Sequence, residues 1–279
     1  MRFEANFDLR SALVKLQQRH EQALRGADLA FHEAALLDGL TVAGMAFRPL
    51  YRECLERSGT RVPAWKRLRR AQRAYQLARY AESTARLPGC RVECGVLRGL
   101  SALLIAAVLR KAAPALEARE LYLVDSFQGL SAMHPADALR LAASPAQQTG
   151  EYAMSEGSFG DTSAAHVREA MAAYGGCSVL QGWIPEVLDS LPGTQWAFVH
   201  LDVDLYEPTL GALEYFVPRL AEGAVVINDD YLSPLFPGAG QAWDEFFEEK
   251  NLPFVVLDSG QAVFENRART PAMTPSQSP

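Results

Sequence analysis

A strand, a glycine-bearing turn and the start of a helix follow one another in Arg91-Val92-Glu93-Cys94-Gly95-Val96-Leu97-Arg98-Gly99-Leu100-Ser101. The same rhythm of a short apolar run and then a helix-like stretch continues along the chain. The apolar runs lie at 91–94, 121–124, 178–181, 197–201, 224–227, 254–257 and 262–264. Between the first five, helix-like segments begin near Ser101, Ser163, Pro185 and Thr209. Strands that alternate with helices predict an α/β fold with a mainly parallel sheet covered on both faces.

The last two apolar runs are joined in a different way. The connection Asp258-Ser259-Gly260 is typical of a hairpin and not of a helical crossover. We therefore expect a doubly wound, Rossmann-like sheet of seven strands that is mainly parallel and ends in an antiparallel hairpin.

Three zones of the chain differ in pattern. Residues 1–88 carry apolar side chains at three- and four-residue spacing, which predicts an N-terminal helical extension. Pro49 and Ser58-Gly59 interrupt this pattern, and Val62-Pro63-Ala64 opens another helix. Residues 89–265 form the predicted α/β domain. Residues 266–279 contain three prolines among small polar residues and are expected to be a disordered tail.

Composition narrows the class of protein. The chain has 279 residues, 49% of them hydrophobic and 22% charged, as in an ordinary globular protein. A net charge of -6 argues against a nucleic-acid partner. No apolar run is long enough to span a bilayer, and the N-terminus does not resemble a signal peptide, so we expect a cytoplasmic protein with no membrane partner. The cysteines lack the spacing of a metal site and are expected to be free thiols: Cys54, Cys90, Cys94 and Cys177.

The first turn is suited to a ligand at the carboxyl end of the sheet. Gly95 allows close approach to the backbone, but the Gly-x-Gly-x-x-Gly fingerprint is absent, which disfavours a nicotinamide dehydrogenase. Glu93 would repel a phosphate, yet it suits a ligand with ammonium and sulfonium charges. The alternative is a purely structural turn. Asp125 ends the second run, where an acid commonly accepts ribose hydroxyls or, alternatively, caps a turn.

Four acids follow two other strands. The fourth run ends in His200-Leu201-Asp202-Val203-Asp204-Leu205-Tyr206, and the fifth ends in Ile227-Asn228-Asp229-Asp230-Tyr231. Parallel strands end at the same edge of a sheet, so these carboxylates can converge. Clustered carboxylates repel one another unless a cation lies among them, and oxygen ligands suit Mg²⁺ or another hard divalent ion.

Other side chains allow two interpretations each. His200 is either a hydrogen-bonded core residue or a proton acceptor. The pair Gly182-Trp183 either stacks on a flat ring or is part of the core. The segment from Leu130 to Gly160 has the composition of a lid over a ligand. A basic run is expected to be one solvated helix face: Lys66, Arg67, Arg69, Arg70 and Arg73.

Taken together, six motifs in order over residues 75–250 resemble the macrocin O-methyltransferase family, S-adenosylmethionine-dependent enzymes that methylate sugar hydroxyls of antibiotics. The motifs are Val92-Glu93-Cys94-Gly95-Val96 with Arg98-Gly99, Asp125-Ser126-Phe127-Gln128-Gly129-Leu130, Gly157-Ser158-Phe159, Gly182-Trp183-Ile184-Pro185, 200–206 with Thr209, and Asp229-Asp230-Tyr231. The resemblance implies the class I methyltransferase fold. It implies cofactor contacts by Glu93, Gly95, Arg98, Ser101, Asp125, Ser126, Gly182, Trp183 and Asp202. It also implies that Asp202, Asp229 and Asp230 bind the divalent ion.

A sugar hydroxyl is a poor nucleophile, so the expected mechanism needs metal assistance and a base, for which Asp204 is the first candidate and His200 the second. The expected acceptor is a small hydroxylated molecule, a sugar in the first place. A catechol or another non-sugar hydroxyl is the alternative acceptor. A catalytically idle domain that serves assembly is the alternative from another class. The N-terminal helices suit a homodimer.

Overall fold

The computed structural model describes residues 12–16, 37–63, 66–115, 120–138, 154–175, 177–192 and 195–267. Most of the first 36 residues, the middle of the expected lid and the tail from residue 268 lie outside this described part, so the predictions made for them are not tested. Among the described residues, no helix has the length and apolar character needed to cross a membrane.

Seven strands form one sheet in the order β5-β4-β3-β6-β7-β9-β8. Five of them pair in parallel: β3 (Cys90–Cys94), β4 (Leu121–Asp125), β5 (Ser178–Gln181), β6 (Trp196–Leu201) and β7 (Leu220–Asn228). The last two, β8 (Val255–Val256) and β9 (Ala262–Glu265), form an antiparallel hairpin whose second strand also pairs with β7. The predicted seven-stranded sheet and its final hairpin are confirmed.

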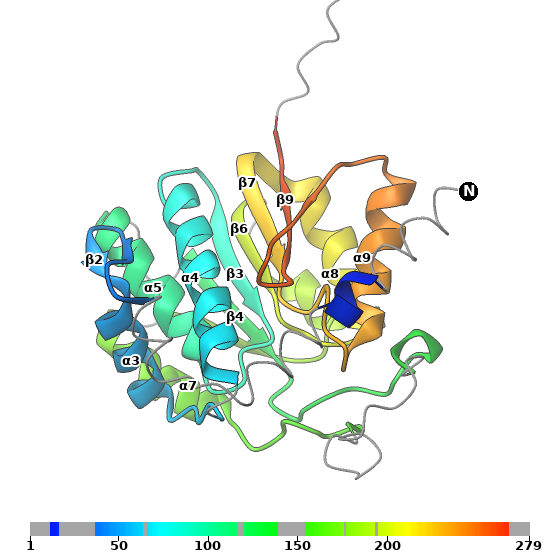
Figure 1. The fold of residues 1–279 in the computed structure, drawn as a ribbon, viewed down its shortest axis with the longest axis horizontal. Coiled ribbons are helices and arrows are strands. Elements are labelled where there is room, and N and C mark those ends of the chain that lie inside the picture. The colour runs from blue at the N-terminus through cyan, green and yellow to red at the C-terminus, as the bar shows by residue number, and fades with distance from the viewer. Residues whose placement is uncertain are drawn as a thin grey trace, which may run out of the picture.

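Helices cover both faces of this sheet (Figure 1). One face carries α3 (Phe47–Ser58), α4 (Arg67–Thr84), α5 (Leu100–Ala112) and α7 (Ala164–Met171), and the other carries α8 (Tyr206–Phe216) and α9 (Pro237–Glu249). Because side chains alternate along a strand, Phe198 of β6 belongs to the first core and its neighbour Val199 to the second. Trp243 of α9 is fully buried in the second core.

Some local predictions differ from the structure. Pro49 does not interrupt a helix, because it lies in the first turn of α3, where proline is tolerated. The small hairpin of β1 (Thr41–Val42) and β2 (Met45–Ala46) was not expected. After Pro185 the chain forms only a short 3-10 helix, η5 (Glu186–Ser190). Further 3-10 turns are η3 (Pro135–Asp137), η4 (Ala172–Tyr174) and η6 (Val217–Arg219).

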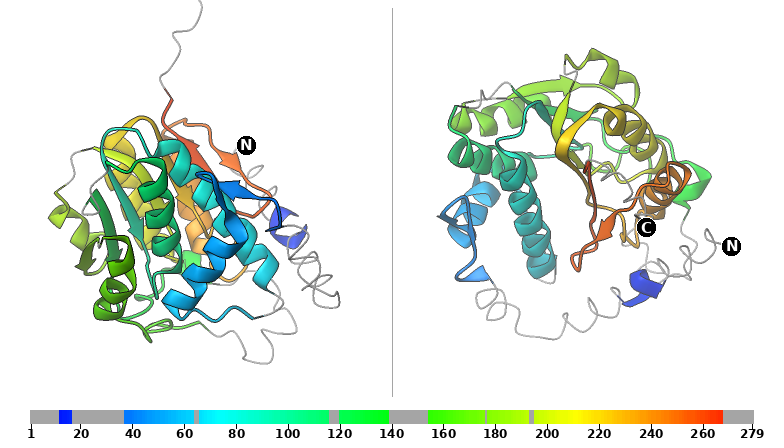
Figure 2. Two further views of the ribbon diagram at one scale, coloured as in Figure 1. Left: turned by 90° about the vertical axis from the view of Figure 1, so that its left-hand side faces the viewer. Right: turned by 90° about the horizontal axis from the view of Figure 1, so that it is seen from above.

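Helix α4 is the element of the N-terminal zone that matters for the site. It packs against α5 and also contacts β6 and β7 (Figures 1 and 2). The order of the strands reverses between β3 and β6, which places a crevice at their carboxyl ends. The register puts Glu93 of β3 beside His200 of β6, and Leu201 beside Asn228 of β7. The acids that follow these strands therefore meet at one edge.

Candidate active site

A cavity of about 500 Å³ opens at the carboxyl ends of the central strands. This volume is in the range of small-molecule sites. Eight residues singled out in the sequence line it: Gly95, Asp125, Ser126, Gly182, Trp183, Asp202, Asp204 and Asp230. The structure thus brings the first turn, the second strand end and the acidic cluster around one space.

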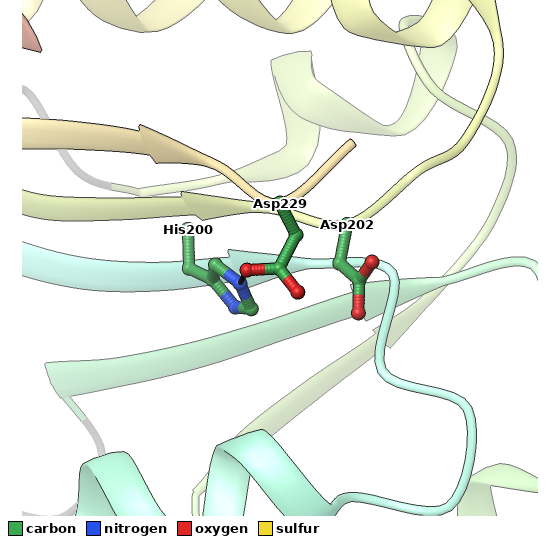
Figure 3. Close-up of side chains that lie close together, drawn as sticks. All are labelled: His200, Asp202 and Asp229. Carbon is green, nitrogen blue, oxygen red and sulfur yellow. Dashed lines mark hydrogen bonds and ion pairs between the residues drawn. The ribbon is translucent and has the colours of Figure 1, made fainter. Parts of the chain in front are cut away.

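The carboxylates of Asp202, Asp204 and Asp230 form a compact group, with one oxygen from each within 4.8 Å of the others. A second group within the same limit consists of His200, Asp202 and Asp229 (Figure 3). The backbone N–H of Asp204 donates a hydrogen bond of 3.2 Å to Oδ2 of Asp230. Asp204 itself has a φ of +63°, a left-handed conformation that Asp tolerates better than most residues. The loop after β6 is thereby tied to the end of β7.

The electrostatics of the compact group suit a cation. Burial, followed by repulsion from Asp202, raises the pKa of Asp230 to about 8. Burial and the neighbouring carboxylates likewise raise the pKa of Asp202 and raise that of Asp204 well above its ordinary value. Three carboxylates that resist ionisation together are the donor set that a hard divalent ion stabilises, so these residues fit such an ion.

Asp229 is held differently from its three neighbours. Its Oδ1 accepts hydrogen bonds from Nε2 of Gln261 at 2.6 Å and from Nε2 of His200 at 3.3 Å. Its Oδ2 lies 3.3 Å from Nη2 of Arg73. Burial alone would raise the pKa of Asp229, but Arg73 and His200 outweigh burial and hold the pKa well below its usual range. Asp229 is therefore ionised throughout the neutral range.

His200 lies between two carboxylates beneath the cavity. Its Nδ1 is 2.9 Å from Oε1 of Glu93, and both side chains are fully buried. Burial would lower the pKa of His200, but the hydrogen bonds to Asp229 and Glu93 outweigh it and raise the pKa to about 10. A protonated, buried imidazole outside the cavity lining positions Asp229, and this geometry favours Asp204 over His200 as the proton acceptor.

The turn after β3 is built around Gly95 and Asp125. Oδ2 of Asp125 accepts the backbone N–H groups of Val96 and Leu97 at 2.7 and 2.9 Å, and its Oδ1 accepts that of Phe127. Asp125 therefore does cap the turn, and it also borders the cavity. Oδ1 accepts only one of these hydrogen bonds and so has a further lone pair for a ligand hydroxyl.

Three of the predicted cofactor contacts do not line the cavity. Glu93 is buried beside His200, and a hydrogen bond from Ser101 lowers the pKa that burial raises in Glu93. Arg98 forms an ion pair of 2.6 Å with the exposed Asp161. In the structure, Glu93, Arg98 and Ser101 interact with other protein side chains around the turn.

The prediction of one solvated basic face is wrong for most of its residues. Lys66, Arg69, Arg70 and Arg73 line the cavity, and only Arg67 of this run is exposed on α4 as expected. Arg73 reaches Asp229 and, at 3.8 Å, Oδ1 of Asp230. The spacing of three and four residues already placed these side chains on one side of a helix. The carboxylates that Arg73 reaches lie more than 150 residues further on, where local sequence gives no signal.

Two other residues around the site were not singled out in the sequence. Gln261 follows the turn of the final hairpin and is fully buried against Asp229. Phe236 lines the cavity from the loop after β7. The ends of the expected lid lie together, since Leu130 exchanges backbone hydrogen bonds with Gly157 and Ser158. The function of a lid stays a prediction.

The sheet order and the position of the cavity define the class I methyltransferase fold. The solved structure of the O-methyltransferase NovP is 24% identical, with a TM-score of 0.57, and covers 86% of this chain and 100% of that one. The calicheamicin methyltransferase CalS11 is 20% identical, with a TM-score of 0.61, over 86% and 97% of the two chains. These likenesses show the fold.

The family follows from a direct match. The family model described as "Macrocin-O-methyltransferase (TylF)" matches residues 64–264, and the chain belongs to this family. A tetracenomycin rhamnosyl 4'-O-methyltransferase of Streptomyces olivaceus is 36% identical over 154 residues, which are 52% of this chain and 54% of that relative. The match therefore spans about half the length of that relative. Mycinamicin III 3''-O-methyltransferase of Micromonospora griseorubida is 28% identical over 71% of this chain and 78% of its own.

Proposed function

We propose that this chain is an S-adenosylmethionine-dependent and divalent-metal-dependent O-methyltransferase that acts on a hydroxyl of a sugar or of a glycosylated natural product. The observation that carries the proposal is the carboxylate group of Asp202, Asp204 and Asp230 in the wall of the cavity that also contains Gly95 and Asp125. The relatives act on sugar-bearing antibiotics by name, which supports the acceptor class. The homodimer and the cytoplasmic location stay predictions from the sequence.

We assign ion binding, cofactor binding and proton transfer to different residues of the site. Asp202 and Asp230 of the carboxylate group would hold the ion together with Asp229, which lies close to Asp202 but does not line the cavity. Asp125 with Ser126 would hold the ribose of the cofactor at the end of β4. When bound, the cofactor supplies a sulfonium methyl group and the ion stabilises an alkoxide on the acceptor. Asp204 would take the hydroxyl proton, because its carboxylate lines the cavity beside Asp202 and Asp230. In its ionised form it is a stronger base than an exposed Asp, since its pKa is raised. His200 and Gln261 keep Asp229 in place.

The test measures binding and turnover separately. S-adenosylmethionine and its demethylated product are titrated calorimetrically with Mg²⁺ and with EDTA. Methyl transfer is measured on a panel of sugars, sugar diphosphates and glycosylated natural products. Asp204→Asn is expected to keep cofactor binding and to lose turnover by about 100-fold or more. Asp258→Asn, which removes an exposed acid of the hairpin turn, is the control and should act like the natural sequence.

Two results would contradict the proposal. If the cofactor does not bind saturably with Mg²⁺ or with EDTA, the proposal of a methyltransferase activity is wrong. If Asp204→Asn keeps nearly full turnover, Asp204 is not the base, but the proposed reaction and its other residues are unaffected.

A further inference from the structure

Positive charge is concentrated in one part of an acidic protein. Residues 48–73 hold nine of the chain's 27 lysines and arginines and only two acids, although the net charge of the chain is -6. Five of these cationic side chains line the cavity, against four carboxylates. The five are Arg61, Lys66, Arg69, Arg70 and Arg73. The lining of the cavity therefore contains a cationic group of side chains as well as the acidic one.

The cations form a row that leads away from the acids. From Lys66 to Arg73 the chain rises by about 10 Å along α4, which is longer than a single carboxylate of a ligand. Arg73 stands at the acidic end, where it meets Asp229. At the other end, Arg61 also lines an adjoining hollow together with Arg48, Arg52 and Arg67. An extended anion would find positive charge along its whole length.

These side chains are costly to bury beside one another. Burial and, next, the charge of Arg73 lower the pKa of Arg69 to about 9. Nε of Arg73 is buried and has no hydrogen-bond partner among the described residues. A divalent ion on the carboxylates, as the proposed function requires, would add to the positive surplus. Planar guanidinium groups recognise phosphate oxygens through paired, charge-assisted hydrogen bonds, which would offset this cost.

We propose that the acceptor is a sugar that still carries a diphosphate, with the diphosphate bound along Lys66, Arg69 and Arg70 and the sugar hydroxyl directed toward Asp204. This inference rests on the proposed function and names its substrate class. The methyl group replaces the hydroxyl proton, which passes to Asp204, and the diphosphate bond stays intact. The product then suits a glycosyl transfer, in which the diphosphate is the leaving group, as the reaction that consumes it.

The experiment compares a nucleoside diphosphate with its uncharged match on the full chain. Uridine 5'-diphosphate and uridine are titrated calorimetrically in Mg²⁺ and in EDTA, with the demethylated cofactor titrated in parallel. We expect the diphosphate to bind at least tenfold more tightly than uridine. Arg69→Gln and Arg70→Gln should each weaken it about tenfold, since each removes charge-assisted hydrogen bonds. Arg79→Gln, on the exposed side of the same helix, should change it less than twofold. Thermal unfolding checks that each variant is folded.

Each outcome has one meaning. Equal affinity for uridine and its diphosphate in the natural sequence overturns the inference without any variant. Equal weakening by Arg79→Gln also overturns it, because the effect would then be general charge attraction. If the demethylated cofactor binds and the diphosphate does not, the proposed function is unaffected, but the inference of a sugar diphosphate as the acceptor is wrong. If the cofactor itself fails to bind, the proposed function falls first.

Discussion

The closest backbone approach in the site gives the sharpest test of the structure. Gly95 has a φ of +83°, and a Cβ built on it would lie 2.6 Å from the carbonyl carbon of Asp202 and closer still to its oxygen. Real Cβ atoms essentially never come within 3.0 Å of another heavy atom outside their own neighbours. The same two loops are tied by a hydrogen bond of 2.9 Å from the N–H of Asp202 to the carbonyl of Cys94. Gly95→Ala must therefore push β3 and the loop after β6 apart.

Gly99→Ala is the matched control. Gly99 has the same φ of +83°, but the nearest atom to its added Cβ is in Val167 at 3.8 Å, an ordinary contact. Both variants bear the left-handed penalty of an L-residue, about 1–2 kcal/mol. Only Gly95→Ala adds overpacking against backbone, about 1–3 kcal/mol more. We expect losses of about 1–2 kcal/mol for Gly99→Ala and about 2–5 kcal/mol for Gly95→Ala.

The assay is equilibrium unfolding in urea, followed by calorimetric titration of Mg²⁺ and of the cofactor at a temperature where both variants are folded. Because the clash lies on the backbone of Asp202, Gly95→Ala should also weaken the binding of the ion, whereas Gly99→Ala should not. Equal losses of stability in the two variants would refute the close approach. Normal ion binding by a folded Gly95→Ala protein would refute its link to Asp202.

Two further predictions concern the buried charges. In EDTA, the unfolding free energy should fall as the pH rises from 6.5 toward 10, by on the order of 4 kcal/mol, because the folded state raises the pKa of His200 from 6.5 to about 10 and so favours its protonated form. The raised pKa of Asp230, about 8, also makes the folded state less stable as the pH rises. Above pH 8, Mg²⁺ should therefore offset part of the loss of stability. A stability in EDTA that is constant or increases with pH would contradict this prediction. Glu93→Gln keeps the shape of the side chain and removes a charge 2.9 Å from His200. It should lower the pKa of His200 in an NMR titration and reduce the unfolding free energy by about 1–3 kcal/mol. Glu222→Gln on the exposed side of β7 is its control, and an unchanged pKa of His200 in Glu93→Gln would contradict the pairing.

The sheet could be predicted because its signal is local. Each strand is an apolar run bounded by turn residues, and the hairpin turn differs in composition from a helical crossover. The missed helix α9 has a local signal as well, since Trp243, Phe246 and Phe247 recur on one buried side. Pro49 was misjudged because a proline in the first turn of a helix looks the same in sequence as one that breaks it. Boundaries of this kind depend on the packing around them.

The site could be predicted only as far as the sheet itself positions it. Asp202 and Asp230 converge because parallel strands end at one edge, and this follows from the strand assignment alone. Arg73 and Gln261 reach Asp229 through the packing of α4 and of the final hairpin, which no spacing along the chain encodes. From sequence alone, a charged side of a helix is expected to face solvent. In the structure most of this side of α4 lines the cavity instead, so the expectation was wrong.

The four acids at the strand ends divide into one whose pKa the protein lowers and three whose pKa it raises. Three donors fix Asp229 in the charged form: Arg73, His200 and Gln261. Asp202, Asp204 and Asp230 are buried, and their mutual repulsion raises their pKa values. Under the proposed function, a divalent ion would be attracted first by the fixed charge of Asp229, and its own charge would then favour loss of the protons from the other three. Such binding would release protons below about pH 8, because Asp230 keeps a raised pKa beside Arg73 alone. We therefore expect the arrangement to stabilise a doubly charged ion more than the singly charged side chain of Arg73 that already lies beside it.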